Sequence, residues 1–482
     1  MEYKATIGLE IHAELKTESK MFCSCKNDPL EEEPNANVCP VCMGHPGTLP
    51  VINQKAVKMV VKAGLALDCA INKQSRFERK NYFYPDLPKG YQISQYALPL
   101  CKAGYLDLKD KRIRIERIHL EEDTAKLLHK ANETLVDFNR AGVPLMELVT
   151  EPDFENGEQV YNFAKELQLI FRYLGISDAD MEKGEMRLEA NISVSKDNIL
   201  GTKVEVKNLN SFRIVKKAID YEIQRQIKLL ESNKKVVQET RGWDKDKQET
   251  FAQRSKEGAP DYRYFPEPDL PPLEFNKSQI EELKNELPEL PVYKRQRFRD
   301  EYGLKEEDIE IFVSNKDLSE YFEQVVSEFK EWMESGKRGE LDQKKLAQIS
   351  SNYLLTDLVG LMGDISVEDK NFLITAENFS EFIYLIYTKK ITSKIAKTVL
   401  REMFERGGDP SEIIKDKGLE SVGKGELSQI IDQIIEENQK AVRDFQKGKQ
   451  NALQFLIGQA MAKTKGRANP NQLKQLFTKA LK

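Results

Sequence analysis

Alternating hydrophobic and charged residues predict a long β-strand over residues 112–122, RIRIERIHLEE. Alternation with a period of two is typical of a strand that buries one face. The phase slips by one residue at Arg117, and a β-bulge leaves this trace in a sequence. The inward positions on this interpretation are Ile113, Ile115, Ile118 and Leu120. We therefore expect one bulged strand with an apolar inner face.

Two glutamates interrupt the apolar faces of the predicted strands. Glu122 falls on the same inner face as positions 118 and 120, and in a second strand Glu147 shares a face with Val143, Leu145 and Val149. A buried carboxylate must be paired, protonated or bound to a cation. Two inward glutamates on separate strands therefore indicate a metal site. The alternative is a different register that leaves each carboxylate in solvent.

A third strand, ATIGLEIHAEL, begins near the N-terminus and places Glu10, His12 and Glu14 on one face. A carboxylate and an imidazole two residues apart on a strand can share one divalent cation. Ligands rich in oxygen favour Mg²⁺ or Mn²⁺. The alternative is an ordinary solvated strand face.

Four cysteines follow as two close pairs, Cys23 with Cys25 and Cys39 with Cys42, separated by a loop-like gap. In a reducing cytoplasm this spacing favours a structural zinc site over disulfides. A set of unliganded thiols is the alternative. We expect the segment 23–42 to form a zinc knob.

The remaining pattern predicts an α+β domain followed by helices. Helices are expected over 157–174 and from Ser211, as N-cap, to Leu230, among strands with acid-rich polar faces. This combination favours an antiparallel sheet. Six prolines between positions 266 and 291 mark a boundary, and GGDP at 407–410 suggests a hinge. The expected domains are residues 1–292, 293–406 and 407–482.

Composition adds a cellular location to this picture. Of the 482 residues, 40% are hydrophobic and 32% are charged, which is ordinary for a soluble globular protein. No apolar run approaches the ~20 residues of a membrane span, and strand-like sequence begins directly after Met1. We therefore expect a cytoplasmic protein that does not insert into a membrane.

Charge is distributed unevenly although the net value is only −5. Residues 440–482 carry ten Lys or Arg and a single acid, Asp444. A basic tail on an acidic body indicates a polyanionic partner. Lys463, Lys465 and Arg467 lie on the loop KTKGRANP and suit contact with a nucleic-acid backbone. A merely solubilising tail is the alternative.

Residues 76–95 combine cations with aromatic rings. Arg79 and Lys80 lie close in sequence to Tyr82, Phe83, Tyr84 and Tyr91. Such a mixture suits a nucleotide or an RNA end, although an aromatic core edged by surface charge has the same composition. Arg263, further along the chain, is a second candidate for phosphate contact. The chain has no P-loop, so a bound nucleotide is held without a Walker lysine.

Long segments of the chain also resemble one known family. The chain contains, in this order, GLEIH, CPVCMGHPGTLP, RKNYFYPDLPKGYQISQ, HLEED, DFNRAGVPLMELVTEPD, MRLEANIS, GTKVEVKNLNSF, QETRGWD, DYRYFPEPDLPPL and GQAMAKTKGRANP. Together they resemble the B subunits of the aspartyl/glutamyl-tRNA(Asn/Gln) amidotransferases over essentially the whole chain. The resemblance implies a cradle domain similar to glutamine synthetase and two all-α C-terminal domains that grip tRNA.

The resemblance also implies an activity and partners. The B subunit uses ATP and Mg²⁺ to phosphorylate the side-chain carboxylate of Glu or Asp on a mischarged tRNA. Ammonia from the glutaminase (A) subunit then displaces the phosphate, and with a small C subunit the three chains form a heterotrimer. A non-catalytic tRNA scaffold and a free-standing ligase for small amino acids are the competing hypotheses.

By motif match, the family's catalytic and magnesium-binding positions correspond to residues on four predicted strands. They are Glu10, His12, Glu122 and Glu147, with Glu189 as a further magnesium ligand. Glu189 stands where the family commonly has aspartate, so its carboxylate is one methylene further from the backbone. Lys89 matches the ammonia path. Arg79, Lys80 and Arg263 are the expected ATP contacts, and zinc at the four cysteines would be structural.

Overall fold

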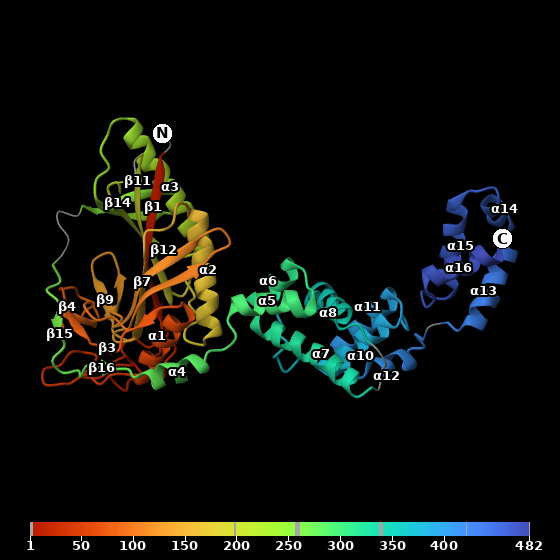
Figure 1. Ribbon diagram of the computed structural model, residues 1–482, viewed down its shortest axis with the longest axis horizontal. Coiled ribbons are helices and arrows are strands. Elements are labelled where there is room, and N and C mark those ends of the chain that lie inside the picture. The colour runs from red at the N-terminus through yellow and green to blue at the C-terminus, as the bar shows by residue number, and fades with distance from the viewer. Residues whose placement is uncertain (1–2, 197–198, 256–260, 337–340, 421, 482) are drawn as a thin grey trace. The chain divides into compact units, whose positions relative to one another are not determined.

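The computed structural model describes residues 3–196, 199–255, 261–336, 341–420 and 422–481. The chain divides into two compact units, Met1–Pro291 and Val292–Lys482 (Figure 1). The first unit is built on a sheet and the second is helical. The expected α+β fold with a helical C-terminal region is therefore confirmed. The boundaries given for three separate domains stay a prediction.

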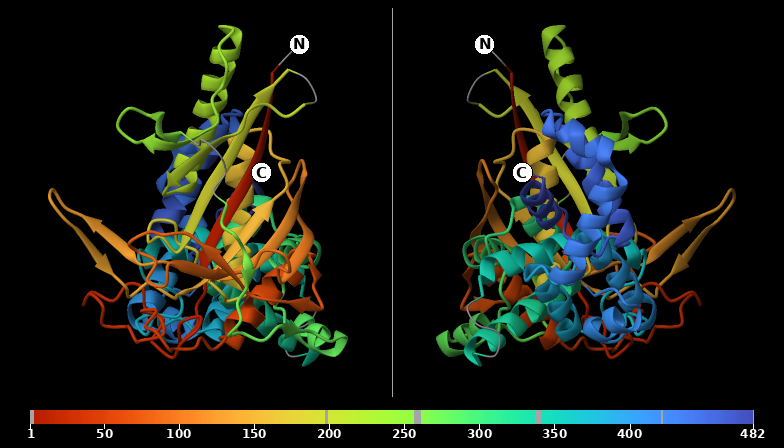
Figure 2. Two further views of the ribbon diagram at one scale, coloured as in Figure 1. Left: turned by 90° about the vertical axis from the view of Figure 1, so that its left-hand side faces the viewer. Right: turned by 90° about the vertical axis from the view of Figure 1, so that its right-hand side faces the viewer.

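A nine-stranded sheet organises the first unit, and every neighbouring pair is antiparallel except β12 and β13. Figure 2 shows the two long strands β1 and β11 side by side in both views. In spatial order the strands are β14 (Glu249–Ser255), β13 (Glu239–Asp244), β12 (Val204–Leu209), β11 (Met186–Ser195), β1 (Lys4–Glu14), β10 (Pro144–Thr150), β7 (Arg112–Glu122), β6 (Cys101–Asp107) and β2 (Ala70–Ile71).

Smaller sheets surround this one. The three-stranded sheet contains β15 (Phe265–Pro266), β4 (Glu78–Asn81) and β5 (Tyr91–Ser94), in that order. Two pairs complete the set: β16 (Leu273–Glu274) with β3 (Gln74–Ser75), and the hairpin of β8 (Lys126–His129) and β9 (Thr134–Asp137).

One face of the large sheet is apolar and covered by helices. The helices of this unit are α1 (Gln54–Ala66), α2 (Gly157–Tyr173), α3 (Phe212–Glu231) and α4 (Lys277–Asn285). α1 packs on β6 and β7, while α3 packs on β11, β12 and β14. The caps explain where these helices begin, since Asn156 accepts a hydrogen bond from the Gln159 N–H and Ser211 accepts one from Ile214. Both long predicted helices are confirmed.

The predicted bulge in β7 is present. β7 pairs with β10 so that Val149 lies opposite Arg117 and Thr150 lies opposite Ile115, which leaves Glu116 as the extra residue. Ile113, Ile115, Ile118 and Leu120 are all at most 1% exposed. The residues between them point to the opposite face of the sheet, which is polar.

Helices make up the second unit. They are α5 (Pro291–Tyr302), α6 (Glu306–Ser314), α7 (Lys316–Glu334), α8 (Gln343–Asn352), the π-helical turn η1 (Tyr353–Leu358), α9 (Val359–Met362), α10 (Ala376–Tyr387), α11 (Ser393–Arg406), α12 (Pro410–Asp416), α13 (Lys424–Glu437), α14 (Gln439–Gln446), α15 (Gln450–Lys463) and α16 (Pro470–Ala480). α12 packs against α10 and α11, and the tail helices have their own core between Val422 and Leu481. Among the described residues, none of the helices has the length and apolar character needed to cross a membrane.

Candidate active site

The polar face of the sheet gathers two histidines and three glutamates from three adjacent strands. His12 on β1 lies opposite Glu147 on β10, and Glu147 lies opposite His119 on β7. Paired residues on antiparallel strands point to the same face, so the three side chains meet. Glu10 and Glu121, each two residues from a histidine on its own strand, join them on the same face. We call Glu10, His12, His119, Glu121 and Glu147 the polar-face centre.

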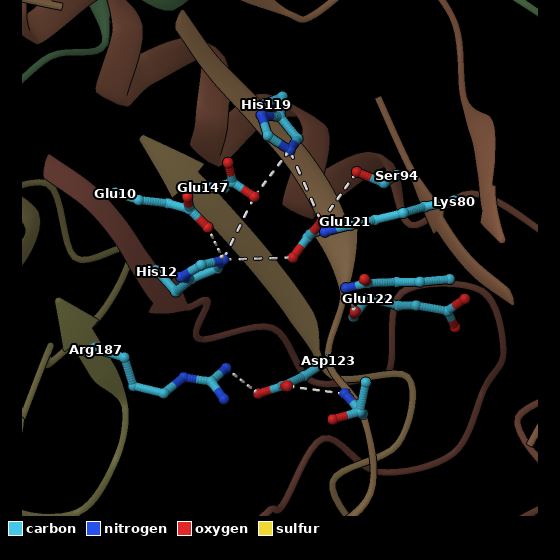
Figure 3. Close-up of polar contacts among 12 residues, drawn as sticks. Glu10, His12, Lys80, Ser94, His119, Glu121, Glu122, Asp123, Glu147 and Arg187 are labelled. Atoms are coloured by element: carbon cyan, nitrogen blue, oxygen red, sulfur yellow. Dashed lines mark hydrogen bonds and ion pairs between the residues drawn. The ribbon is translucent and has the colours of Figure 1, made fainter. Parts of the chain in front are cut away.

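The ligand atoms of the polar-face centre converge around Glu147 (Figure 3). His12 Nε2 lies 3.4 Å from Glu147 Oε2, 3.7 Å from Glu121 Oε1 and 3.8 Å from Glu10 Oε1. His119 Nε2 lies 3.4 Å from the same Glu147 oxygen and 3.8 Å from Glu121 Oε2. Glu147 therefore belongs to two overlapping groups, one with Glu10 and His12 and one with His119 and Glu121.

This arrangement fits a small divalent cation. Separations of 3.4–3.8 Å exceed a good N–H···O hydrogen bond. Neighbouring ligands around an octahedral ion with bonds of about 2.1 Å are about 3 Å apart, so a small inward movement of the side chains forms a coordination shell. Carboxylate and imidazole donors suit Mg²⁺ and Mn²⁺. The His119 Nδ1 atom is buried with no hydrogen-bond partner among the described residues.

The charges of the polar-face centre depend on one another. Burial raises the pKa of Glu10, and the Glu147 carboxylate raises it further. Burial by itself lowers the pKa of His119, but Glu147 and Glu121 outweigh burial and raise it to about 9. Burial raises the pKa of Glu147, but His119 and His12 outweigh it and hold the pKa well below its ordinary value. The mutual dependence marks these groups as candidates for function.

Glu122 lies outside the polar-face centre, so the structure does not bring it together with Glu10, His12 and Glu147, and its assignment as a catalytic and magnesium-binding residue stays a prediction. Its carboxylate accepts hydrogen bonds from Lys89 Nζ at 2.7 Å and from the Ile93 N–H at 2.9 Å. Glu122 lies on the core side of β7, as predicted, because it continues the alternation of Ile118 and Leu120, and it is only 3% exposed. The error lay in placing Glu147 on that same face, because the register pairs Glu147 with His119.

Glu189 lies beside the polar-face centre but outside its two groups. It is opposite Glu10 in the register of β1 and β11, and its Oε2 pairs with Lys207 Nζ at 2.7 Å. Arg187, two residues before Glu189 on the same face of β11, pairs with Asp123 at 2.6 Å and so ties β11 to the end of β7 (Figure 3). The assignment of Glu189 as a magnesium ligand stays a prediction.

The three predicted ATP contacts occupy different surroundings. Lys80 Nζ lies 4.0 Å from Glu121 Oε2, at the edge of the polar-face centre. Arg79 makes a two-point ion pair with Glu267, at 2.6 and 2.8 Å, and stacks over Tyr91. Arg263 is exposed. Lys80 is therefore the cation among the three that the fold brings to the polar-face centre.

A cavity of about 240 Å³ lies next to Glu122. Lys89 and Glu122 line it together with Arg79, Asp269 and residues of the cysteine segment, including Cys23 and Cys42. The Lys89–Glu122 ion pair is buried, since the two side chains are 14% and 4% exposed. The cavity is thus polar and large enough for a small nitrogen compound.

The four cysteines form one compact cluster, with all four Sγ atoms within 4.8 Å of one another. Cys39 Sγ and Cys42 Sγ are 3.9 Å apart. Tetrahedral Zn²⁺ with bonds of about 2.3 Å separates its sulfur ligands by about 3.8 Å. A hydrogen bond from Cys23 lowers the pKa of the Cys42 thiol to about 5, against the opposing effect of burial. The cluster can hold structural zinc.

The predicted tRNA contacts lie at the end of α15, which finishes at Lys463, and on the loop that leads to α16. Lys463 and Lys465 are exposed and Arg467 is half-buried. Lys463 pairs with Glu437 at 2.9 Å, and Lys465 has a left-handed backbone with φ of 53°. The assignment of these residues to tRNA stays a prediction.

His119 and Glu121 are the members of the polar-face centre that sequence reasoning missed. The signal was present, because the bulge that turned Ile118 and Leu120 inward also turned positions 117, 119 and 121 outward. The prediction singled out Glu122 instead, because an acid on the apolar face of a strand is more unusual than an acid on the polar face. The centre lies on the other face, which the same alternation defines.

Comparison with known proteins identifies the family of the chain. Residues 5–281 match the model of the GatB/GatE catalytic domain, and residues 337–481 match that of the GatB domain. The chain is 47% identical over 489 residues to the B subunit of the aspartyl/glutamyl-tRNA(Asn/Gln) amidotransferase from Caldanaerobacter subterraneus subsp. tengcongensis, with all of both chains covered. The protein of that name from Thermotoga maritima is 44% identical over 494 residues, covering 100% of this chain and 99% of its own. The chain therefore belongs to the family of aspartyl/glutamyl-tRNA(Asn/Gln) amidotransferase B subunits.

Proposed function

We propose that this chain activates and amidates the side-chain carboxylate of Glu or Asp carried by a mischarged tRNA. The observation that carries the proposal is the convergence of two imidazoles and three carboxylates on the polar face of the sheet. A carboxylate is a poor electrophile towards ammonia until one of its oxygens becomes a phosphate leaving group. The same polar-face centre therefore serves a phosphoryl transfer followed by an amide-forming substitution.

Both steps balance with ATP and ammonia as co-reactants. In the first, a side-chain oxygen of the substrate bonds to the γ-phosphorus of ATP, and the bond to ADP breaks. In the second, ammonia bonds to the acyl carbon, the carbon–oxygen bond breaks, and phosphate leaves with its electron pair. The nitrogen then loses a proton. The product is the amide, Gln or Asn, still esterified to tRNA.

The polar-face centre would hold Mg²⁺ through Glu10, His12 and Glu147 and through His119 and Glu121. When bound, Mg²⁺ neutralises charge on the phosphates. Lys80, 4.0 Å from Glu121, adds a fixed positive charge for the phosphoryl oxygens. Arg117, 3.8 Å from Glu147 Oε1, adds a second one from β7. These residues align two anions that repel one another in water.

Ammonia would enter through the cavity beside Glu122. The Lys89–Glu122 ion pair lines it, and Gln92 Nε2 donates to the Glu122 carbonyl oxygen at 2.6 Å. A polar cavity suits a small neutral donor of hydrogen bonds. A chain of this family implies partner chains, and we propose that a glutaminase (A) subunit supplies the ammonia and that a small C subunit makes the complex a heterotrimer.

The cysteine cluster and the basic tail have supporting roles in this proposal. Zinc at Cys23, Cys25, Cys39 and Cys42 would stabilise the loop that walls the cavity. Lys463, Lys465 and Arg467 would contact the phosphate backbone of tRNA. Neither role requires contact with the reacting atoms.

The test is phosphate release by the reconstituted complex with ATP, Mg²⁺ and either Glu-tRNA(Gln) or Asp-tRNA(Asn). We expect release that depends on a mischarged tRNA, and amidation when glutamine is added. Absence of release would support a tRNA scaffold. Release that ignores tRNA would support a ligase for small amino acids. Either outcome contradicts the proposal.

A further inference from the structure

Four tyrosines form a continuous wall next to the polar-face centre. Tyr82 and Tyr262 meet edge to face at 5.9 Å between ring centroids, and Tyr262 and Tyr264 do so at 6.0 Å. Tyr264 stacks on Tyr96 at 4.5 Å with 9° between the ring planes. We call these four residues the tyrosine wall. They come from three segments, one after β4, one after β5 and one before β15, and β4 and β15 lie side by side (Figure 1).

Lys80 joins the tyrosine wall to the polar-face centre. Its Nζ lies 5.4 Å from the centroid of the Tyr262 ring and 4.0 Å from Glu121 Oε2. A ligand that reaches from the wall to the centre therefore meets aromatic rings, then a positive charge, then carboxylate and imidazole donors. A nucleotide has the matching order of groups, because its base is flat and its phosphates are anionic.

Hydrogen bonds hold the tyrosine wall in place. Glu78 Oε2 accepts the N–H groups of Tyr96 and Ala97, at 2.9 and 2.7 Å. Asn81 donates its N–H to the Tyr262 carbonyl oxygen at 3.0 Å. Tyr82 donates its hydroxyl to Gln92 Oε1 at 3.3 Å. Rings fixed before a ligand arrives lose little freedom when it binds.

Exposure separates the tyrosine wall from a packing cluster. The core rings Phe154 and Phe163 also meet edge to face, at 5.1 Å, and both are 0% exposed. Tyr96 is 59% exposed even though one side of its ring stacks on Tyr264. The outer face of the Tyr96 ring is therefore available to a flat ligand, which the buried rings of a packing cluster are not.

We propose that the outer face of the Tyr96–Tyr264 stack binds the adenine base of an adenosine ligand whose reactive group lies at the polar-face centre. The proposal rests on the proposed function and deepens it. Adenosine reaches this site from two sources, as ATP or as the 3′-terminal nucleotide that carries the amino acid on tRNA. In both, the base lies at one end and the reacting group at the other.

The test measures the affinity of the assembled complex for each source of adenosine. Tyr96→Leu removes the ring at an exposed position, so the chain is expected to fold normally. Tyr96→Phe keeps the ring, and Tyr293→Leu is a matched control because Tyr293 is 60% exposed on a helix of the second unit. The ligands are a non-hydrolysable ATP analogue and uncharged tRNA with and without its terminal adenosine.

Loss of one stacked base weakens binding by about 5- to 150-fold. If ATP supplies the base, Tyr96→Leu lowers the affinity for the ATP analogue by this factor and leaves the affinity for tRNA unchanged. If tRNA supplies the base, the variant lowers the affinity for intact tRNA. For tRNA without its terminal adenosine, the variant and the wild type then bind equally. Tyr96→Phe and Tyr293→Leu are expected to bind as the wild type does in both cases.

Unchanged affinity of Tyr96→Leu for every ligand would overturn this inference. An equal loss for tRNA with and without its terminal adenosine would also overturn it, because the ring would then act elsewhere on the tRNA. Failure of the proposed function gives a different result, since the wild-type complex would then show no tRNA-dependent phosphate release.

Discussion

Two buried groups of charges in the first unit differ in how well their members are paired. Glu222 on α3 is 0% exposed and accepts hydrogen bonds from Arg225, Gln226 and Thr250 at distances of 2.7–2.9 Å. The Glu147 side chain on β10 is 6% exposed, but its nearest imidazole nitrogens are 3.4 Å away and its arginine neighbour is 3.8 Å away.

The difference separates a structural role from a functional one. At Glu222 the described residues supply three partners at hydrogen-bond distance, with Arg241 Nε further away at 3.5 Å, so the charge ties α3 to β14 without any ligand. At Glu147 the imidazole nitrogens of His12 and His119 point at the same carboxylate oxygen but lie 3.4 Å from it, which is longer than a good hydrogen bond. Burial alone therefore does not identify a site, and the spacing of the partners does.

The largest effect is expected from Glu147→Gln. The substitution keeps the shape of the side chain and removes a charge shared by both ligand groups of the polar-face centre. Phosphate release dependent on mischarged tRNA is expected to fall at least about a hundred-fold, while the melting temperature is maintained. The control is Glu18→Gln, whose wild-type side chain is 95% exposed. Full activity of Glu147→Gln would show that the gathering of charges is incidental.

The opposite result is expected from Glu222→Ala. It leaves Arg225, whose side chain is 20% exposed, without its nearest carboxylate. Removal of one partner from a buried pair costs about 3–5 kcal/mol in the free energy of unfolding, and we expect a loss near the lower end of this range. Denaturant unfolding measures the loss, and the folded protein is expected to keep its activity. Glu231→Ala, at an exposed position on the same helix, is the control. Stability equal to that of the wild type would contradict a structural role for Glu222.

Removal of zinc tests a third cluster, the four cysteines, whose arrangement can hold an ion. Zinc at a hundred times its dissociation constant stabilises the fold by about 2.7 kcal/mol. We expect Cys42→Ser to lose bound zinc and that stabilisation, and protease to cut the loop between Cys25 and Cys39 more readily. Metal analysis and limited proteolysis measure both. A variant without zinc that resists protease like the wild type would contradict a structural role.

The smallest effect is expected in the tail. Lys465 is exposed, and Lys465→Ala would remove one phosphate contact, so the slope of log affinity for tRNA against log salt concentration should fall by about 1. Turnover at saturating tRNA should stay unchanged. Lys111→Ala, in the first unit, provides the control. An unchanged slope for Lys465→Ala would place tRNA elsewhere on the chain.

The sequence predicted the elements well because local patterns determine them. Asn156 and Ser211 cap their helices as polar residues before an apolar stripe do, and the phase slip at Arg117 marks the bulge. The cysteine cluster also followed from spacing alone, because two close pairs can meet across one loop.

The composition of the polar-face centre depended on pairing between strands, which no local pattern contains. Glu147 and Glu122 were placed on one face because each interrupts an apolar alternation. The observed register pairs Glu147 with His119 instead. Glu222 was missed for a related reason. It lies three residues after Ile219 and four before Gln226, so it shares the buried stripe of α3, but a charged residue in a helix is usually assigned to solvent.

The most direct measurement of the central claim is the binding of Mn²⁺ to the protein without nucleotide or tRNA, followed by electron paramagnetic resonance. We expect the wild type to bind Mn²⁺, Glu147→Gln to bind it at least about tenfold more weakly, and Glu222→Gln and Cys42→Ser to bind it as the wild type does. Equal binding by wild type and Glu147→Gln would contradict the account, because the five donors would then not form a cation site.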